Sequence, residues 1–246
     1  KDIIIFENNL PFIVIDQIKF LLDHQLYLKH SGRSFVSPSN ETIKFLEHFN
    51  IKPKNIIDLG ACWGEYSLFL SKKFPNSNIF SIEGSEKNYD ILNINLNQNP
   101  DLSKNIKPFN LIISDKNGYE EISDSISTMN TLKSVIHTKE TKYKKIKSNK
   151  LDTFIMDHNI DIDFLKIDIE GSELKLLPDL TKIFAKSMQI ELINYNSIET
   201  NIDFLEQISI YYDFYDPNGW ILLNIENLIE IVIKTLKNKL TIDVFM

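Results

Sequence analysis

Two acidic residues that follow a short apolar segment are the strongest candidates for chemistry in this sequence. Asp168 and Glu170 come after the apolar run at residues 164–167, and Gly171 follows them. Side chains two positions apart in an extended chain point to the same side. In open α/β sheets, ligands bind beyond the carboxyl ends of the strands, so we expect both carboxylates to face a binding site. Glu170 could equally stabilise the N-terminus of the next helix, where acidic side chains are favoured.

A glycine-containing turn is the second candidate. Residues 55–57 form an apolar run typical of a buried strand, Asp58, Gly60 and Gly64 follow, and residues 66–74 have the apolar spacing of a helix. A strand, glycine turn and helix in this order let the backbone approach a ligand closely and point the first helical amides at it. The spacing differs from the three-glycine pattern of dinucleotide-binding folds.

Glu83 supports a nucleoside-binding interpretation of that turn. It ends a strand-like run at residues 77–83, roughly twenty residues beyond the turn, where Rossmann-type folds place the acid that binds the ribose hydroxyls. Such a pair suits any adenosine-containing cofactor. S-adenosylmethionine is favoured over a nicotinamide dinucleotide, because it has no pyrophosphate and its ammonium group could face Asp58.

These segments together resemble the FkbM family of S-adenosylmethionine-dependent methyltransferases. The matching stretches occur in the expected order at residues 57–68, 82–89, 113–118, 150–154, 164–173 and 190–192. Two positions depart from the family pattern, since Cys62 replaces an Asn and Gly84 replaces a Pro, and we expect altered packing there. The cofactor-binding residues that the resemblance and the turn imply are Asp58, Gly60, Ala61, Cys62, Gly64, Glu65, Tyr66, Glu83, Gly84, Ser114, Asp115 and Asp168.

Methyl transfer requires an aligned acceptor and, for a hydroxyl acceptor, a group that takes its proton. Asp168 is the first candidate for this base, Glu191, at the end of a strand-like run at residues 188–192, is the second, and Glu170 is the third. Oxygen ligands of this kind could hold a divalent ion. We expect a site without metal.

Composition narrows the possible partners. The 246 residues carry a net charge of −7, which argues against a general nucleic-acid binder. A single cysteine excludes an internal disulfide and fits a cytoplasmic location. No apolar run reaches the length of a membrane span. The sequence does not indicate an oligomeric state.

The resemblance implies an α/β, Rossmann-like class I methyltransferase fold. This fold has a mostly parallel seven-stranded sheet whose last strand is antiparallel, with helices on both faces. We expect residues 39–246 to form this domain and residues 1–38 to be an N-terminal appendage, with residues 11–23 forming a strand and then a helix. The other expected helices are at 39–49, 88–96 and 200–212, and the other expected strands at 110–115, 219–225 and 240–246.

Several residues have two interpretations. The family resemblance implies an acid beside the adenine, so Asp115 could accept a hydrogen bond from the adenine amine, or it could cap the turn at residues 116–118. The lysines between residues 139 and 150 could bind a phosphorylated substrate, although a solvated edge strand is preferred. Trp220 and Tyr215 could line an acceptor pocket, although packing is preferred. Arg33 and Phe35 could reach the site, and His137 could accept a proton, although ordinary structural positions are favoured for all three.

The sequence therefore predicts an S-adenosylmethionine-dependent O-methyltransferase. Its acceptor would be a hydroxyl on a sugar, a surface glycan or a small-molecule natural product, and the sugar could be nucleotide-linked. Two alternatives remain, a nicotinamide-dependent oxidoreductase and a cofactor-binding subunit without catalytic activity.

Overall fold

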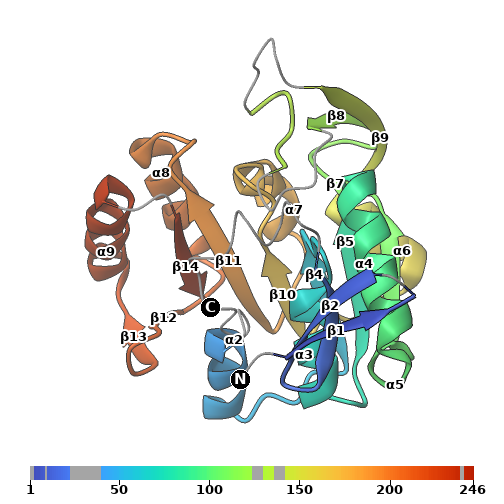
Figure 1. The fold of residues 1–246 in the computed structure, drawn as a ribbon. Coiled ribbons are helices and arrows are strands. Elements are labelled where there is room, and N and C mark those ends of the chain that lie inside the picture. The colour runs from blue at the N-terminus through green and yellow to red at the C-terminus, as the bar shows by residue number, and fades with distance from the viewer. Residues whose placement is uncertain (1–2, 9, 23–39, 124–129, 136–141, 239–240) are drawn as a thin grey trace.

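An eight-stranded sheet forms the centre of the molecule (Figure 1). The computed structural model describes residues 3–8, 10–22, 40–123, 130–135, 142–238 and 241–246. Across the sheet, the strands are β13 (Ile221–Leu223), β12 (Phe214–Asp216), β14 (Thr241–Phe245), β11 (Ser187–Ile193), β10 (Phe164–Ile167), β4 (Asn55–Leu59), β5 (Asn78–Glu83) and β6 (Ile106–Asn110).

The strand directions confirm the predicted fold class. Strands β11, β10, β4, β5 and β6 are parallel, while β14, the last strand of the chain, is antiparallel to β11. The sheet has one strand more than predicted. Strand β13 lies within the strand expected at residues 219–225, and the short β12, which pairs with it, was not predicted.

Helices cover both faces of the sheet, as predicted. One face carries α6 (Leu151–His158), α7 (Leu177–Leu180), α8 (Ile198–Ile208) and α9 (Ile225–Asn238), whose buried side chains join one core cluster. The other face carries α2 (Asn40–His48), α3 (Glu65–Lys73) and α4 (Glu86–Gln98), which contribute to a second cluster. The short helix α5 (Pro100–Ser103) lies between α4 and β6 in the chain, and the 3₁₀ helix η1 (Glu173–Leu176) leads into α7.

The two faces differ in polarity because strand side chains alternate between them. Leu165 and Ile167 of β10 join the cluster under α6–α9, which we call the apolar face. Phe164 lies in the cluster under α2–α4, and Lys166 shares its side of the strand. On this second face, called the polar face, the residues in register across the sheet are Gln189, Lys166, Asp58 and Ser81, all of them buried.

The N-terminal segment is a small sheet of β1 (Ile3–Glu7), β2 (Leu10–Ile15) and β3 (Ile18–Leu21). The helix expected in the second half of residues 11–23 was wrong. Asp16 and Gln17 have φ values of 48° and 65°, and two successive positive φ values form a tight hairpin turn between β2 and β3. The predicted boundary at residue 38 lies outside the described residues.

The hairpin docks on α4 through two asparagines. The backbone N of Lys19 donates to Oδ1 of Asn99 at 2.9 Å, and the backbone N of Leu21 donates to Oδ1 of Asn95 at 2.7 Å. These bonds use the edge amides of β3, which therefore remain satisfied without a further strand.

The strand predicted at residues 110–115 was misplaced. The chain leaves the main sheet after Asn110, and β7 (Ile112–Ile113) belongs to a separate small sheet with β9 (Tyr143–Asn149) and β8 (Gly118–Ser123). The missed strand β6 contains Pro108, which is tolerated because β6 is an edge strand.

The lysine-bearing segment is not an edge strand, since β9 lies between β7 and β8. Its lysines are nevertheless solvated. Ile146 and Ser148 are buried, while Lys144 pairs with Glu86 and Lys145 lies over the ring of Tyr119. Lys139 and His137, like Arg33 and Phe35, lie outside the described residues.

None of the helices in the described part of the chain combines the length and apolar character needed to cross a bilayer.

Candidate active site

The turn between β4 and α3 is shaped by two glycines. Gly60 has a φ of 77°, and a Cβ at this residue would lie 1.7 Å from the backbone O of Asp168. Gly64 has a φ of 83°, and its Cβ would lie 2.4 Å from Cδ1 of Leu92. A side chain at Gly60 would displace backbone, so the turn lies directly against the segment that follows β10.

The carboxylate of Glu83 ends β5 beside this turn. The backbone N of Cys62 donates to its Oε2 at 2.8 Å, and the backbone N of Ser85 donates to its Oε1 at 2.7 Å. Burial raises the pKa of Glu83 to about 7, although these two bonds oppose the shift. Each oxygen has lone-pair capacity left for a donor from a ligand.

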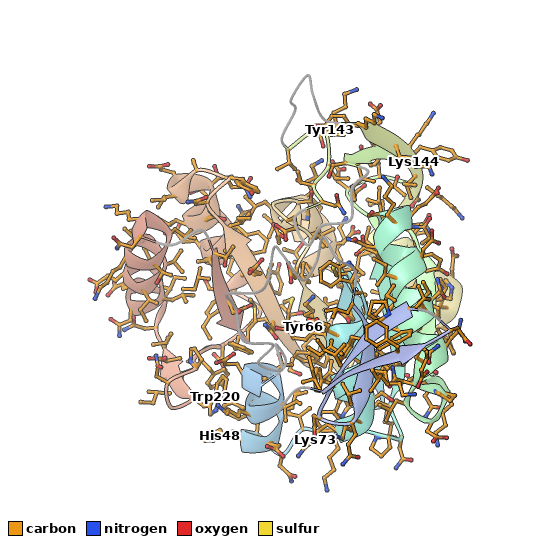
Figure 2. The ribbon with its side chains drawn as sticks, in the orientation of Figure 1. His48, Tyr66, Lys73, Tyr143, Lys144 and Trp220 are labelled. Carbon is orange, nitrogen blue, oxygen red and sulfur yellow. The ribbon has the colours of Figure 1, made fainter. Side chains whose placement is uncertain are left out.

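A buried ammonium lies beneath the turn. Lys166 Nζ is 3.3 Å from Oδ1 of Asp58, 3.3 Å from Oδ2 of Asp168 and 3.2 Å from the backbone O of Gly60. It also lies 4.5 Å from the ring centroid of Tyr66, a side chain that Figure 2 places near the middle of the molecule. Burial alone would lower the pKa of Lys166. The charges of Asp168 and Asp58 outweigh this effect and hold the pKa well above its usual value.

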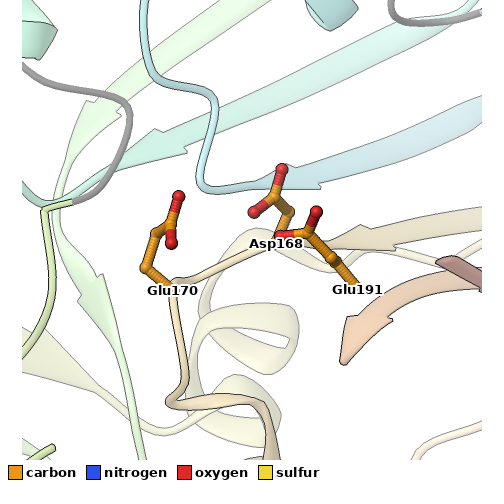
Figure 3. Close-up of side chains that lie close together, drawn as sticks. All are labelled: Asp168, Glu170 and Glu191. Atoms are coloured by element: carbon orange, nitrogen blue, oxygen red, sulfur yellow. The ribbon is translucent and has the colours of Figure 1, made fainter. Parts of the chain in front are cut away.

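Three carboxyl groups gather at the carboxyl ends of β10 and β11. Asp168, Glu170 and Glu191 each offer an oxygen, and these oxygens lie within 4.8 Å of one another. Figure 3 shows Asp168 and Glu191 side by side, with the carboxylate of Glu170 on the other side of the same space. The structure therefore brings the three predicted catalytic residues together.

The local field perturbs these acids strongly. Burial, the charge of Asp168 and a hydrogen bond with Asp168 raise the pKa of Glu191 to about 9. Burial, followed by the charges of Asp168 and Glu173, raises the pKa of Glu170 to about 8. Burial raises the pKa of Glu65 to about 7, with Lys166 opposing the shift. Perturbed acids of this kind in a cleft are typical of functional sites.

These groups line one cavity of about 440 Å³. Its size is within the range of small-molecule sites. Of the predicted residues, those that line the cavity are Gly60, Ala61, Cys62, Glu65, Tyr66, Glu83, Gly84, Asp168, Glu170 and Glu191.

Four predicted cofactor residues lie elsewhere. Asp58 is fully buried below the turn, where it pairs with Lys166 and accepts a hydrogen bond from Ser67 Oγ at 2.7 Å. Gly64 is the N-cap residue of α3 and does not line the cavity. Ser114 is buried without lining the cavity, and Asp115 is exposed on the turn that follows β7. Direct contacts of these four residues with a cofactor remain predictions.

An apolar wall contributed by the small sheet was missed by the sequence analysis. Ile112, Ile122 and Leu132 line the cavity together with the amide side chain of Asn130. A Cβ at Gly84 would lie 2.9 Å from Cγ1 of Ile112 and 3.0 Å from Cδ1 of Ile122. Because this wall joins distant segments, no local pattern could indicate it.

Lys166 and Trp63 were also missed. Both line the cavity, and Trp63 Nε1 donates to Oδ1 of Asn88 at 3.1 Å. Lys166 carried a usable signal, because a lysine inside an apolar strand is rarely buried unless it is paired.

The remaining aromatic candidates pack in the core. Trp220 lies 5.3 Å from Phe45 and 5.2 Å from Phe245 between ring centroids, beside α2 (Figure 2). Tyr215 lies 4.6 Å from Phe49 between centroids. Neither lines the cavity, which confirms packing as the preferred interpretation.

The cavity fits an adenosyl sulfonium better than a pyrophosphate. The glycine turn lies against the backbone of Asp168, and Glu83 lies beside the turn. The cavity also has an apolar wall, and most of its ionisable lining residues are acids. The three clustered carboxylates could also hold a divalent ion. Lys166 already places one positive charge 3.3 Å from Oδ2 of Asp168, and a site without metal stays our prediction.

The sheet order, with an antiparallel β14 next to β11, and the glycine turn after β4 define a Rossmann-like fold of the methyltransferase type. The profile of the family described as "Methyltransferase FkbM domain" matches residues 58–225. The chain belongs to the FkbM methyltransferase family, as the resemblance predicted.

Comparison with solved structures finds low sequence identities. A precorrin-6y C5,15-methyltransferase from Geobacter metallireducens is 13% identical, with 72% of this chain and 74% of that chain covered and a TM-score of 0.42. TYW2 from P. horikoshii, solved with MeSAdo, is 13% identical, with 83% and 61% covered and a TM-score of 0.43, so the chain spans less than two thirds of that protein.

The plantazolicin methyltransferase BamL, solved with SAH, is 8% identical, with 90% of this chain and 88% of that chain covered and a TM-score of 0.46. With TM-scores below 0.5, these likenesses are too weak to support a conclusion by themselves. A search of curated proteins found no match.

Proposed function

We propose that this protein transfers a methyl group from S-adenosylmethionine to a hydroxyl group of a sugar, a surface glycan or a small-molecule natural product. The observation that carries the proposal is the meeting of Asp168 and Glu191 in the cavity that the glycine turn and Glu83 also line. The donor supplies an electrophilic methyl group, and the residues of the chain bind it, orient the acceptor and take the acceptor's proton.

The cofactor is held by the turn and the two ends of the cavity. Backbone at Gly60 and Ala61 would contact it, Glu83 would accept hydrogen bonds from the ribose hydroxyls, and the wall of Ile112, Ile122 and Leu132 would hold the adenine. Asp58, which does not line the cavity, acts on the cofactor through Lys166. The acids of the lining, whose pKa values burial raises, would lose their protons more readily beside a cation, which favours a ligand with a sulfonium and an ammonium group.

Asp168 is the proposed proton acceptor. Glu191, whose pKa is about 9, carries a proton at neutral pH and can donate a hydrogen bond to Asp168. Of this pair, Asp168 is therefore the group proposed to take a proton from the acceptor. Glu170 lies across the space from both side chains. As the acceptor oxygen forms its bond to the methyl carbon and the methyl–sulfur bond breaks, the hydroxyl proton moves to Asp168.

The proposed acceptor class follows from the presence of a candidate base. Methylation of a hydroxyl group needs a base to take its proton, whereas a strong neutral nucleophile can attack the methyl group without one. A sugar nucleotide would supply such a hydroxyl. It would be a cytoplasmic acceptor, in keeping with the cytoplasmic location that the single cysteine of the chain suggests.

Cofactor titration tests the first half of the proposal. Isothermal titration with S-adenosylmethionine, S-adenosylhomocysteine and NADH should show binding of the first two only. Binding of NADH without S-adenosylmethionine would instead support an oxidoreductase.

A screen with methyl-labelled donor tests the second half. Sugar nucleotides, glycans and small phenols or alcohols are supplied as acceptors, and the position of the label is read by mass spectrometry. Asp168→Asn should lose at least about a hundredfold in kcat while keeping its affinity for S-adenosylhomocysteine. Asp157→Asn, at an exposed position on α6, is the matched control and should behave as the wild type. Labelling on nitrogen or carbon would contradict the proposed acceptor.

A further inference from the structure

A lysine lies in the interior of the central sheet. The Lys166 side chain is 3% exposed, and its neighbours in register are Asp58 on β4 and Gln189 on β11. Lysine is rarely buried to this extent unless its charge is compensated. The position therefore calls for a reason other than core packing.

Three oxygens surround the ammonium of Lys166. Nζ donates a hydrogen bond to the backbone O of Gly60 at 3.2 Å, and it forms ion pairs with Oδ1 of Asp58 and Oδ2 of Asp168, each at 3.3 Å. The ring of Tyr66 covers a further side at 4.5 Å. The ammonium stays charged in this setting, because the two carboxylates outweigh the effect of burial on its pKa.

These partners come from separate parts of the cavity. Gly60 belongs to the turn after β4, Tyr66 to the first turn of α3, and Asp168 to the segment after β10. Each of the three also lines the cavity, as Lys166 does. A single side chain thus connects the cofactor turn with the proposed proton acceptor.

We propose that Lys166 is a positioning residue, whose ammonium fixes Asp168 and the Gly60 turn in one arrangement and cancels the charge of Asp58 beneath the cofactor. The proposal rests on the proposed function for the role of Asp168. Its electrostatic part concerns cofactor binding alone, and it is therefore testable without the acceptor.

Another ion pair, formed by residues just before β10 and β11, shows what a structural role looks like. At the amino end of β10, Lys186 Nζ lies 2.6 Å from Oδ1 of Asp163, which also accepts hydrogen bonds from the backbone N atoms of Lys54 and Asn55. Lys186 is half exposed and does not line the cavity. Lys186→Met is therefore a matched control for Lys166→Met.

The test compares two ligands that differ by one methyl group and one positive charge. The affinities of S-adenosylmethionine and S-adenosylhomocysteine are measured by calorimetry at pH 8 for the wild type, Lys166→Met, Lys186→Met and the double variant Asp58→Asn/Lys166→Met. Thermal unfolding of each variant is recorded in parallel.

Lys166→Met should shift the preference toward S-adenosylmethionine by at least about threefold, because a positive charge near the sulfonium has been removed. The double variant removes a positive and a negative charge together, so its preference should return to that of the wild type. It also keeps the test valid if Lys166→Met does not fold. Lys186→Met should lower only the unfolding temperature.

A purely structural role would weaken both ligands in parallel, leaving the preference of Lys166→Met unchanged, and this result would overturn the proposal. So would a shifted preference in the double variant or in Lys186→Met. The positioning role is read from methyl transfer, in which the double variant should lose at least about tenfold in kcat with little change in the acceptor KM. If the wild type methylates no hydroxyl acceptor, the proposed function fails, whereas the ligand preference still decides the role of Lys166.

Discussion

The two faces of the central sheet are built from the same strands and differ in what they bury. On the apolar face, Leu165, Ile167 and Ile190 are fully buried against helices that supply further apolar side chains. On the polar face, the positions between them hold Lys166 and Gln189, which are buried as deeply. Burial on the first face stabilises the fold, while burial on the second depends on matched partners.

The polar row is connected across the sheet. Ser67 Oγ donates to Oδ2 of Asp58 at 2.7 Å and lies 2.5 Å from Oγ of Ser81. Toward the other edge, Thr42 donates to Gln189, whose Nε2 donates to Oδ1 of Asp243 at 2.9 Å. Lys166 of this row lines the cavity, whereas Leu205, in the core under the apolar face, does not. Substitutions on the two faces should therefore separate stability from cofactor binding.

The largest effect on binding is expected from Gly60→Ala. The added Cβ would collide with the backbone O of Asp168, and the positive φ would be strained. We expect the affinity for S-adenosylhomocysteine to fall at least about thirtyfold, which corresponds to ~2 kcal/mol. Calorimetry measures it, with Gly219→Ala as the control, because a Cβ there would only make ordinary contact with Ile221. Unchanged affinity would show that the turn is not the cofactor site.

A core substitution on the apolar face should do the opposite. Leu205 of α8 is fully buried, and Leu205→Ala should lower the free energy of unfolding by about 2–5 kcal/mol through lost burial and a cavity. Urea unfolding measures this loss. The affinity of the folded fraction for S-adenosylhomocysteine should stay within about twofold, and a tenfold loss would refute the separation of the two faces.

The pH dependence of stability provides a smaller but specific comparison. The pKa of Glu191 is raised from its usual value of 4.5 to about 9 in the folded protein, so its stabilising contribution is present below pH 4.5 and is lost as the pH rises through about 9. Glu191→Gln removes this loss. Its unfolding temperature should exceed that of the wild type at pH 9, and the difference should disappear near pH 4.5. Scanning calorimetry between pH 4.5 and pH 9 measures this difference. An unfolding temperature of Glu191→Gln at or below that of the wild type at pH 9 would contradict the prediction.

The smallest effect is expected at Asp115. The structure places this side chain on an exposed turn outside the cavity, which favours the turn-capping interpretation over the adenine contact. Asp115→Ala should change the affinity for S-adenosylhomocysteine by less than about twofold. A tenfold loss would restore the adenine contact.

The sequence predicted the features that depend on local order. The turn at Gly60, the strand end at Glu83 and the acids after β10 each combine an apolar run with a polar end, and all were placed correctly in the fold. Strand β6 was missed because it contains Pro108, which argues against a strand except at the edge of a sheet. The strand was therefore predicted too late in the chain, and Asp115 was wrongly expected at the end of a strand of the main sheet.

Features made by distant segments were not predictable in this way. The apolar wall depends on Ile112, Ile122 and Leu132 meeting through a separate small sheet. The sequence analysis treated Lys166 as part of an apolar strand. Because strand side chains alternate between the two faces of a sheet, its side chain points away from the core that contains Leu165 and Ile167.

The placement of Lys166 opposite Asp58 also has a consequence for how the sheet assembles. The two residues are partners in the β10–β4 pairing, although they lie far apart in the chain. A shift of β10 by one residue would place the side chain of Lys166 in the apolar core under α6–α9 and leave Asp58 without its ion-pair partner. The ion pair thus penalises shifted alignments, and a chain that has closed this sheet correctly has brought the residues around Lys166 together in the same event.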